Sequence, residues 1–348
     1  MRAPRFWYPA RKRGMPIMAQ LLSPFGAFYG LAARIRNKTA RPEHVRVPVI
    51  CIGNVTMGGA GKTPIALAIA ERLIEQGEKV HFLSRGYRRT SQGTVRVDPA
   101  AHTVAEVGDE PLLLARLAPT WVSADRVAGA KAAAGAGASV IIMDDGFQNP
   151  YLAKDFSVLV IDAGVGTGNG HVFPAGPLRE EAGDALNRAQ AVILTGRGHA
   201  GDGLAARAMA RGIPVYRSIA KPVPQEPSFA GAQVLAFSGI GRPEKFYETL
   251  RGLGADIVAT QDFPDHHAFT DREASRLMVR AHECDAHLVT TEKDAIRLAR
   301  APAGSARAKL SESLRTVPIR AVIADMAQLE TLIAEALRRH RLARGEAG

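Results

Sequence analysis

A glycine-rich stretch, TMGGAGKT at positions 56–63, brings a lysine and a threonine together directly after three glycines. An apolar, β-branched run at 45–55 precedes it, and an apolar pattern of helical period at 65–77 follows it. In a strand, loop and helix of this kind, backbone amides face an anion, the lysine reaches the terminal phosphates and the threonine hydroxyl ligates magnesium. The sequence therefore predicts a nucleotide-binding phosphate loop formed by Thr56, Met57, Gly58, Gly59, Ala60, Gly61, Lys62 and Thr63.

The loop departs from the strict pattern G-x-x-x-x-G-K-[ST], because Thr56 stands where that pattern has its first glycine. Gly58, Gly59 and Gly61 offer the backbone freedom instead. The alternative is a glycine-rich turn with a surface lysine, and it accounts less well for the strand and helix on either side. The motif indicates nucleotide binding and leaves the reaction open.

Two adjacent acids, Asp144 and Asp145, end the apolar run SVIIMDDG, where a buried strand is expected to stop. Carboxylates at such a strand end hold magnesium directly or through water. Asp162, which ends the run VLVIDAG, is a rival for this role by pattern alone. Each of these acids could instead cap a helix or sit in a turn.

The stretch FPDHHAF groups Asp265, His266 and His267 in an expected loop. Single histidines are mostly structural, and Asp-His-His also occurs in metal-dependent phosphoesterases. A phosphoesterase would not explain the phosphate loop, so that interpretation ranks low.

The net charge of +11 is concentrated at the N-terminus. Residues 1–41 hold nine of the 45 basic residues and no acid, which leaves 36 basic against 34 acidic residues elsewhere. The uncharged stretch 14–33 between the basic clusters could span a bilayer, lie in its interface or pack as an ordinary helix, and membrane association without a full crossing is the preferred hypothesis. Cys51 and Cys284 fit neither a disulfide framework nor a zinc site, so a reduced, cytoplasm-facing protein is expected.

Strand-like and helix-like runs alternate along the chain, which is typical of an α/β fold with a doubly wound parallel sheet. A proline-rich stretch at 214–232 predicts a hinge. We therefore expect a membrane-associating segment at 1–41, a nucleotide-binding domain at 42–220, and a smaller α/β domain at 221–348 that closes over the active site.

Eight short motifs occur together in a fixed order: GNVTMGGAGKTP, SRGYRR, VGDEP, DDGFQN, GNGHVFPAGPLRE, FSGIGRPEKF, FPDHHAF and TTEKDA. Each motif is weak alone, but the ordered set resembles the tetraacyldisaccharide 4'-kinase family, the lipid A 4'-kinases of lipopolysaccharide synthesis. The resemblance extends from about residue 14 to the final helix.

The resemblance implies transfer of the γ-phosphate of ATP to the 4'-hydroxyl of tetraacyldisaccharide 1-phosphate, giving lipid IVA, with ATP and Mg²⁺ as cofactors. It also implies a protein of the inner membrane, peripheral, monotopic or anchored by one N-terminal segment, with its catalytic domains facing the cytoplasm. By similarity, Asp109 is the base toward the sugar hydroxyl, His266 its partner across the cleft, and Asp265 the residue that orients the pair. The remaining implied roles are catalysis by Lys62 and Asp145, magnesium binding by Thr63, Asp144, Asp145 and Glu180, and substrate positioning by Arg179 and Gln148.

Two other classes of protein remain as alternatives. A GTPase of switch or metallochaperone type would need the guanine-reading pattern [NT]-K-x-D, and the nearest candidate, TEKD at 291–294, has the wrong order. A nucleic-acid-binding ATPase would carry its basic residues among aromatics on a folded face, whereas here they flank an apolar terminal segment. We therefore expect the membrane surface as a partner, and neither nucleic acid nor an obligatory protein partner.

Overall fold

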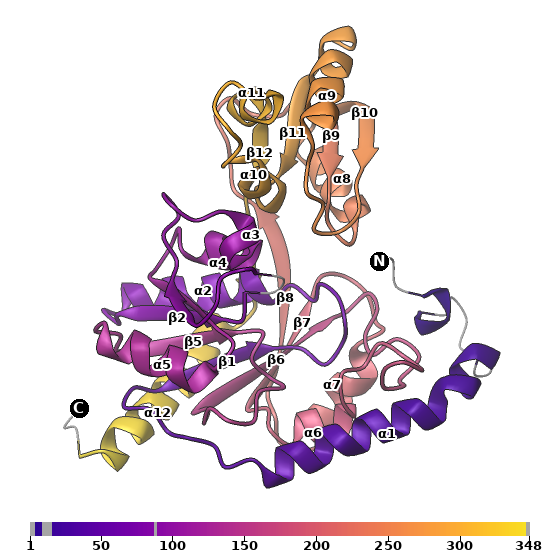
Figure 1. Cartoon of the computed structure of the whole chain (residues 1–348). Helices are drawn as coiled ribbons and strands as arrows, with labels where there is room; N and C mark the ends of the chain where they lie inside the picture. Colours follow the sequence, from indigo (N-terminus) through magenta and orange to yellow (C-terminus); the bar gives the residue numbers. More distant parts are fainter. Residues whose placement is uncertain (1–3, 9–15, 87–88, 346–348) are drawn as a thin grey trace.

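The computed structural model describes residues 4–8, 16–86 and 89–345, and it arranges them in a larger and a smaller α/β domain (Figure 1). Parts of the segments discussed above lie outside this description: four of the nine basic residues of 1–41 (Arg2, Arg11, Lys12 and Arg13), the first two positions of the 14–33 stretch, and Tyr87 and Arg88 of the SRGYRR motif.

The larger domain is built on a nine-stranded sheet of order β13-β8-β7-β6-β1-β5-β2-β4-β3. Its strands are β1 (Val49–Gly53), β2 (Val80–Ser84), β3 (Thr94–Arg96), β4 (Thr120–Ser123), β5 (Val140–Asp144), β6 (Phe156–Asp162), β7 (Ala191–Thr195), β8 (Val215–Pro222) and β13 (Ile319–Ile323). The edge strands β3 and β13 are antiparallel to their neighbours, and the seven strands between them pair in parallel. Every residue of the central strands β1, β5 and β6 is buried, as expected for a sheet covered on both faces. The predicted doubly wound α/β class is confirmed.

Helices pack on both faces of this sheet. They are α2 (Lys62–Glu75), α3 (Val104–Val107), α4 (Asp109–Leu114), α5 (Arg126–Gly135), α6 (Ala182–Leu186), α7 (Asp202–Met209) and α12 (Met326–Ala343). One apolar core joins side chains of α2, α4 and α12 with one face of the sheet, and a second joins α5, α6 and α7 with the other. The functional strands β1 and β5 run between these two cores, which fixes the places where their carboxyl ends emerge.

The smaller domain has a four-stranded parallel sheet of order β10-β9-β11-β12. Its elements are β9 (Gln233–Ser238), α8 (Pro243–Gly252), β10 (Asp256–Asp262), α9 (Asp271–Glu283), β11 (His287–Thr291), α10 (Glu292–Leu298), α11 (Ala306–Ser313) and β12 (Arg315–Val317). Helix α10 faces α4 of the larger domain, and the two domains meet there (Figure 1).

The end of the chain does not stay in the smaller domain, in contrast to the boundary predicted at 221–348. Strand β13 pairs with β8, and α12 buries Leu329, Ile333 and Leu337 in the core of the larger domain. The apolar side of α12 covers one face of the larger sheet. Its partners there are far away in the sequence, so no local pattern predicts this packing. The smaller domain is therefore an insertion between β8 and β13.

The N-terminal region forms a short 3-10 helix, η1 (Arg5–Trp7), and the long helix α1 (Ile17–Thr39), which contains Pro24. Helix α1 packs through Gly26 and Gly30 on Val172, and it leaves a row of large apolar side chains exposed. The exposed row is Ile17, Met18, Leu21, Phe25, Phe28, Tyr29, Leu31 and Ile35. No helix in the described part of the chain combines the length and apolar character needed to cross a bilayer.

Candidate active site

The predicted phosphate loop connects β1 to α2, which begins at Lys62. Gly58 and Gly61 have φ angles of 108° and 81°, a region that glycine enters without steric cost. An added Cβ at Gly58 or Gly59 would meet no atom within 4 Å, so the loop is open on that side. From behind, Thr195 at the end of β7 donates a hydrogen bond of 2.8 Å to the Ala60 carbonyl. The loop is thus supported by β7 on one side and is open at Gly58 and Gly59 on the other.

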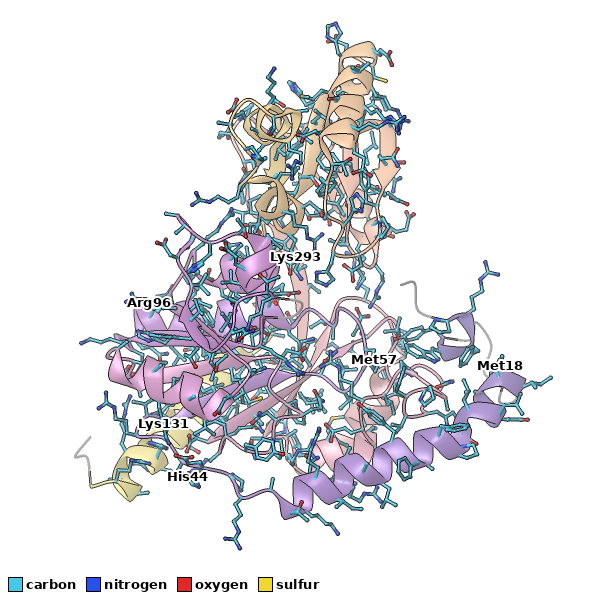
Figure 2. The ribbon with its side chains drawn as sticks, in the orientation of Figure 1. Met18, His44, Met57, Arg96, Lys131 and Lys293 are labelled. Atoms are coloured by element: carbon cyan, nitrogen blue, oxygen red, sulfur yellow. The ribbon has the colours of Figure 1, made fainter. Side chains whose placement is uncertain are left out.

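The start of the loop is tied to a second segment that carries site residues. The Met57 amide donates to the Pro177 carbonyl at 2.7 Å, and Thr56 forms an isolated β-bridge with Leu178. Arg179 and Glu180 follow immediately, so these contacts place the PLRE motif beside the phosphate loop. Figure 2 labels Met57 at the carboxyl edge of the larger sheet.

Asp144 ends β5, the strand next to β1, and its side chain is buried. The Thr63 hydroxyl donates to Asp144 Oδ2 at 3.0 Å, while Asp144 Oδ1 has no hydrogen-bond partner among the described residues. Burial is the main cause that raises the pKa of Asp144 to about 6. A buried carboxylate oxygen without a partner, beside a threonine hydroxyl, fits a hard cation such as Mg²⁺.

Asp145 lies one residue further, with a φ angle of 54° that turns its side chain away from the strand direction. Its carboxylate contacts Arg179 Nη1 at 2.9 Å and Lys62 Nζ at 3.5 Å. Lys62 Nζ also donates to Asn54 Oδ1 at 3.2 Å. Asp145 therefore shares its negative charge with the two cations that face the phosphate loop.

Gln148 connects the remaining predicted residues. Its Nε2 donates to Glu180 Oε1 at 3.0 Å and to the Asn54 carbonyl at 2.8 Å, and Arg179 Nη1 lies 3.3 Å from its Oε1. Glu180 is buried and also paired with Arg188. These contacts join Lys62, Asp145, Gln148, Arg179 and Glu180 in one network, and Thr63 pairs with Asp144 beside Asp145. Among the described residues, Glu180 bonds to Gln148 and Arg188 and not to Asp144.

Asp109 and His266 meet across the two domains. Asp109 is the first residue of α4, and His266 lies in the loop after β10 with a φ angle of 58°. Their Oδ2 and Nδ1 atoms are 3.0 Å apart. The hydrogen bond that His266 donates to Asp109 raises the pKa of His266, while burial acts against it. Asp265 Oδ2 lies 3.9 Å from the other ring nitrogen of His266.

Sequence reasoning missed two cations of α10 that complete this contact. Lys293 Nζ donates to Glu110 Oε1 at 2.6 Å, and Arg297 binds Asp109. Figure 2 shows Lys293 at the end of the smaller domain that faces the larger one. Oxygen and nitrogen atoms of Asp109, Glu110 and His266 lie within 4.8 Å of one another, but two cationic side chains already neutralise the carboxylates, so this cluster is a poor metal site.

Asp162 is not part of the Asp144 site, although its pattern allowed that role. It ends β6, on the other side of β1, and its Oδ2 accepts from Arg242 Nη2 at 2.6 Å and from Lys245 Nζ at 2.9 Å. Both cations come from the smaller domain. Asp162 therefore ties the domains together beside the phosphate loop.

A buried arginine that forms no ion pair within the described part of the chain, Arg126, was also missed. Arg126 begins α5, donates to the Ser123 carbonyl, and leaves its buried Nε without a partner among the described residues. Burial, with the nearby charge of Arg85, lowers the pKa of Arg126 to about 10. An added Cβ at Gly86 would lie 2.9 Å from the Val107 carbonyl, so this positive region borders the turn that carries Asp109. In the sequence, Arg126 follows Asp125 after an apolar run, and this pattern looks like an ordinary helix N-terminus, so it does not mark Arg126 as a site residue.

Known proteins resemble this chain over nearly its full length. A family profile described as tetraacyldisaccharide-1-P 4'-kinase matches residues 18–338. A tetraacyldisaccharide 4'-kinase of Parvibaculum lavamentivorans is 61% identical over 343 residues, 97% of this chain and 100% of that protein. Another, from Rhodospirillum centenum, is 48% identical over 338 residues and 97% of each chain. A crystal structure of "apo" form LpxK from Aquifex aeolicus in complex with ATP matches with a TM-score of 0.70 and 26% identity, over 92% of this chain and 100% of that one.

Proposed function

This chain belongs to the tetraacyldisaccharide 4'-kinase family, and from that membership we propose how its residues carry out the reaction. It is an ATP-dependent kinase that transfers the γ-phosphate of ATP to the 4'-hydroxyl of tetraacyldisaccharide 1-phosphate, forming lipid IVA. The observation that best supports a phosphoryl-transfer site is the pairing of Asp109 with His266 across the domains, next to an open phosphate loop.

The loop amides ahead of Lys62 and the start of α2 bind the β- and γ-phosphates of ATP, and Lys62 contacts the terminal phosphate. Thr63, Asp144 and Asp145 would hold Mg²⁺, with Glu180 near them through Gln148, and the ion would neutralise charge on the phosphates. Arg179 is held by Asp145 and adds positive charge facing the same phosphates. This division leaves the protein to align the reactants, which dominates phosphoryl transfer.

Asp109 accepts the proton of the sugar hydroxyl as the bond to phosphorus forms. His266 holds the carboxylate by a charge-assisted hydrogen bond, and Asp265 stabilises the imidazolium from its other side. Glu110 follows Asp109 in the sequence. Burial and the charges of Lys62 and Asp145 have the larger effects on the pKa of Asp144, and the charge of Glu110 also raises that pKa. The base and the cation site are therefore close enough to interact. Closure of the smaller domain assembles the site and excludes water.

The acceptor brings its own phosphate, and Arg126 with Arg85 supplies positive charge for it. Arg126 is buried and, among the described residues, forms no ion pair, although the charge of Asp145 acts on it; such burial is costly unless an anion approaches. The position of this pair beside the turn before Asp109 supports an acceptor headgroup that reaches from the arginines to the base.

The acyl chains of the acceptor stay in the bilayer, so the enzyme works at a membrane surface. Phe25 and Phe28 on α1 are 65% and 75% exposed, and they belong to the apolar row described above. An interfacial helix with basic flanks binds anionic lipids in this way. We assign the protein to the inner membrane as a peripheral or monotopic protein.

The direct test is incubation with labelled ATP, Mg²⁺ and tetraacyldisaccharide 1-phosphate, followed by chromatography of the lipid. Label in a product with one added phosphate is the expected result, and it should be lost in Lys62→Ala. Competition with unlabelled ATP and GTP separates the kinase from a GTPase switch, because only ATP should displace the label efficiently. Release of labelled phosphate without any labelled lipid would refute the assignment of the acceptor.

A further inference from the structure

We infer that Arg297 is a positioning residue that orients the Asp109 carboxylate toward the acceptor. The side chain of Arg297 is itself held in place by contacts within the smaller domain. The inference rests on the proposed role of Asp109 as the base. Arg297 lies on α10, and its side chain is only 4% exposed. Its Nε donates to Asp109 Oδ2 at 3.0 Å, and its Nη2 donates to the same oxygen.

The guanidinium is held from behind by its own domain. Its Nη1 donates to Asp294 Oδ1 at 2.7 Å and to the Gly239 carbonyl at 2.6 Å. Asp294 is fully buried, and it accepts from the Gly239 amide and the Thr291 hydroxyl as well. An arginine fork with both ends bound has little rotamer freedom left. The fork therefore moves with the smaller domain as a rigid part of it.

The two oxygens of Asp109 become different because of this contact. Oδ2 accepts from Arg297 and from His266 Nδ1, whereas Oδ1 accepts from the Glu110 amide at 3.0 Å. A carboxylate oxygen has two acceptor positions in its plane. Oδ1 is thus the oxygen with room for the sugar hydroxyl, and Arg297 fixes the plane in which it points.

Charge and geometry can be separated at this residue. The groups around Asp109 are the cations Arg297, Lys293 and His266 and the acids Glu110 and Asp265. Burial raises the pKa of Asp109, and the hydrogen bond from His266 and the charges of Lys293 and Arg297 outweigh it and lower that pKa. Such a carboxylate is a weak base but a well-placed acceptor, which suits a loose transition state in which alignment matters most.

The test compares Arg297→Lys and Arg297→Met with the wild type in the lipid phosphorylation assay across pH. Arg297→Lys keeps the charge and loses the fork, so kcat should fall about 10- to 100-fold with the acidic limb of the pH profile unmoved. Arg297→Met also loses the charge that lowers the pKa of Asp109, so its kcat should fall further than that of Arg297→Lys, and the added loss should be largest at the acidic limb. The affinity for ATP, measured by calorimetry without turnover, should stay within about twofold in both, because Arg297 contacts none of the loop.

Lys245→Met is the matched control. It also removes a cation that bridges the two domains, but wild-type Lys245 binds Asp162 and not Asp109. Its acidic limb should coincide with that of the wild type. Wild-type kcat in Arg297→Lys would overturn the inference, and so would a loss at the acidic limb in Lys245→Met equal to that in Arg297→Met. If Arg297→Met does not fold, Arg297→Lys alone decides the geometric part. Absence of transfer by the wild type would instead refute the proposed function.

Discussion

Replacing Asp144 by Asn should stabilise the metal-free protein while it removes activity. The carboxylate is buried at the end of β5 with one oxygen unpartnered, and its pKa is raised to about 6 from an ordinary value of 3.8. Because the folded pKa lies above the unfolded one, folding favours the protonated acid. The stabilising effect is complete below the ordinary value and is lost as pH rises through about 6.

The size of the effect follows from that difference in pKa. At pH 7.5 the ionised side chain costs the folded state about 3 kcal/mol, since each pKa unit corresponds to about 1.4 kcal/mol. Asn keeps the hydrogen bond from Thr63 and carries no charge, so the free energy of unfolding should rise by up to this amount. At pH 4.5 the gain should shrink to about 1 kcal/mol. For a chain of this length, 3 kcal/mol corresponds to an increase of about 3–6 °C in Tm.

The assay is thermal unfolding with a chelator present, at pH 4.5 and 7.5, for the wild type, Asp144→Asn and Asp256→Asn. Asp256 begins the edge strand β10 and is exposed, so its substitution should leave Tm unchanged at both pH values. Added Mg²⁺ should raise Tm of the wild type more than that of Asp144→Asn. An unchanged or lower Tm for Asp144→Asn at pH 7.5, or a gain that does not depend on pH, would refute the reasoning.

Three further predictions concern Asp109, helix α1 and the packing of that helix. Asp109→Asn should lower kcat by about 10²- to 10⁴-fold and leave the Kd for ATP measured by calorimetry unchanged, and a lost ATP affinity would contradict the role of a base. Deleting residues 1–33 should release the protein from anionic vesicles in a sedimentation assay and raise the lipid concentration needed for turnover; equal sedimentation would argue against membrane binding by this segment. Gly26→Leu should lower the free energy of unfolding by about 1–3 kcal/mol, because an added Cβ lies 2.7 Å from the Val172 carbonyl, whereas Gly252→Leu has open space and should have a smaller effect.

Local patterns in the sequence predicted the parts of the site that lie within one strand–loop–helix unit. The phosphate loop follows β1 as expected, and Asp144 ends β5 with Asp145 directly after it as expected, because apolar runs and glycines indicate strands and turns directly. The sheet order then places β5 beside β1, so the loop and the two acids meet. Thr63 and Asp144 are 81 positions apart, and only parallel pairing of these strands brings them to 3.0 Å.

Contacts between the domains could not be predicted in this way. Arg297 stands 188 positions from Asp109, inside a helix where an arginine has no distinguishing pattern. The same holds for Arg242 and Lys245 against Asp162, whose strand-end position suggested a metal ligand. The sequence also did not predict that β13 and α12 belong to the larger domain, because the composition of their apolar faces suits either domain.

The two chain segments that lead into and out of the smaller domain lie side by side as a single ribbon. Ile319 is paired with Pro222, and the Val223 amide donates to the Pro318 carbonyl at 2.9 Å. A two-stranded ribbon twists and bends readily but resists stretching and sliding in its plane, so it acts as one pivot. Under the closure proposed above, the contacts at Asp109 and at Asp162 should therefore form together in one rotation about this ribbon.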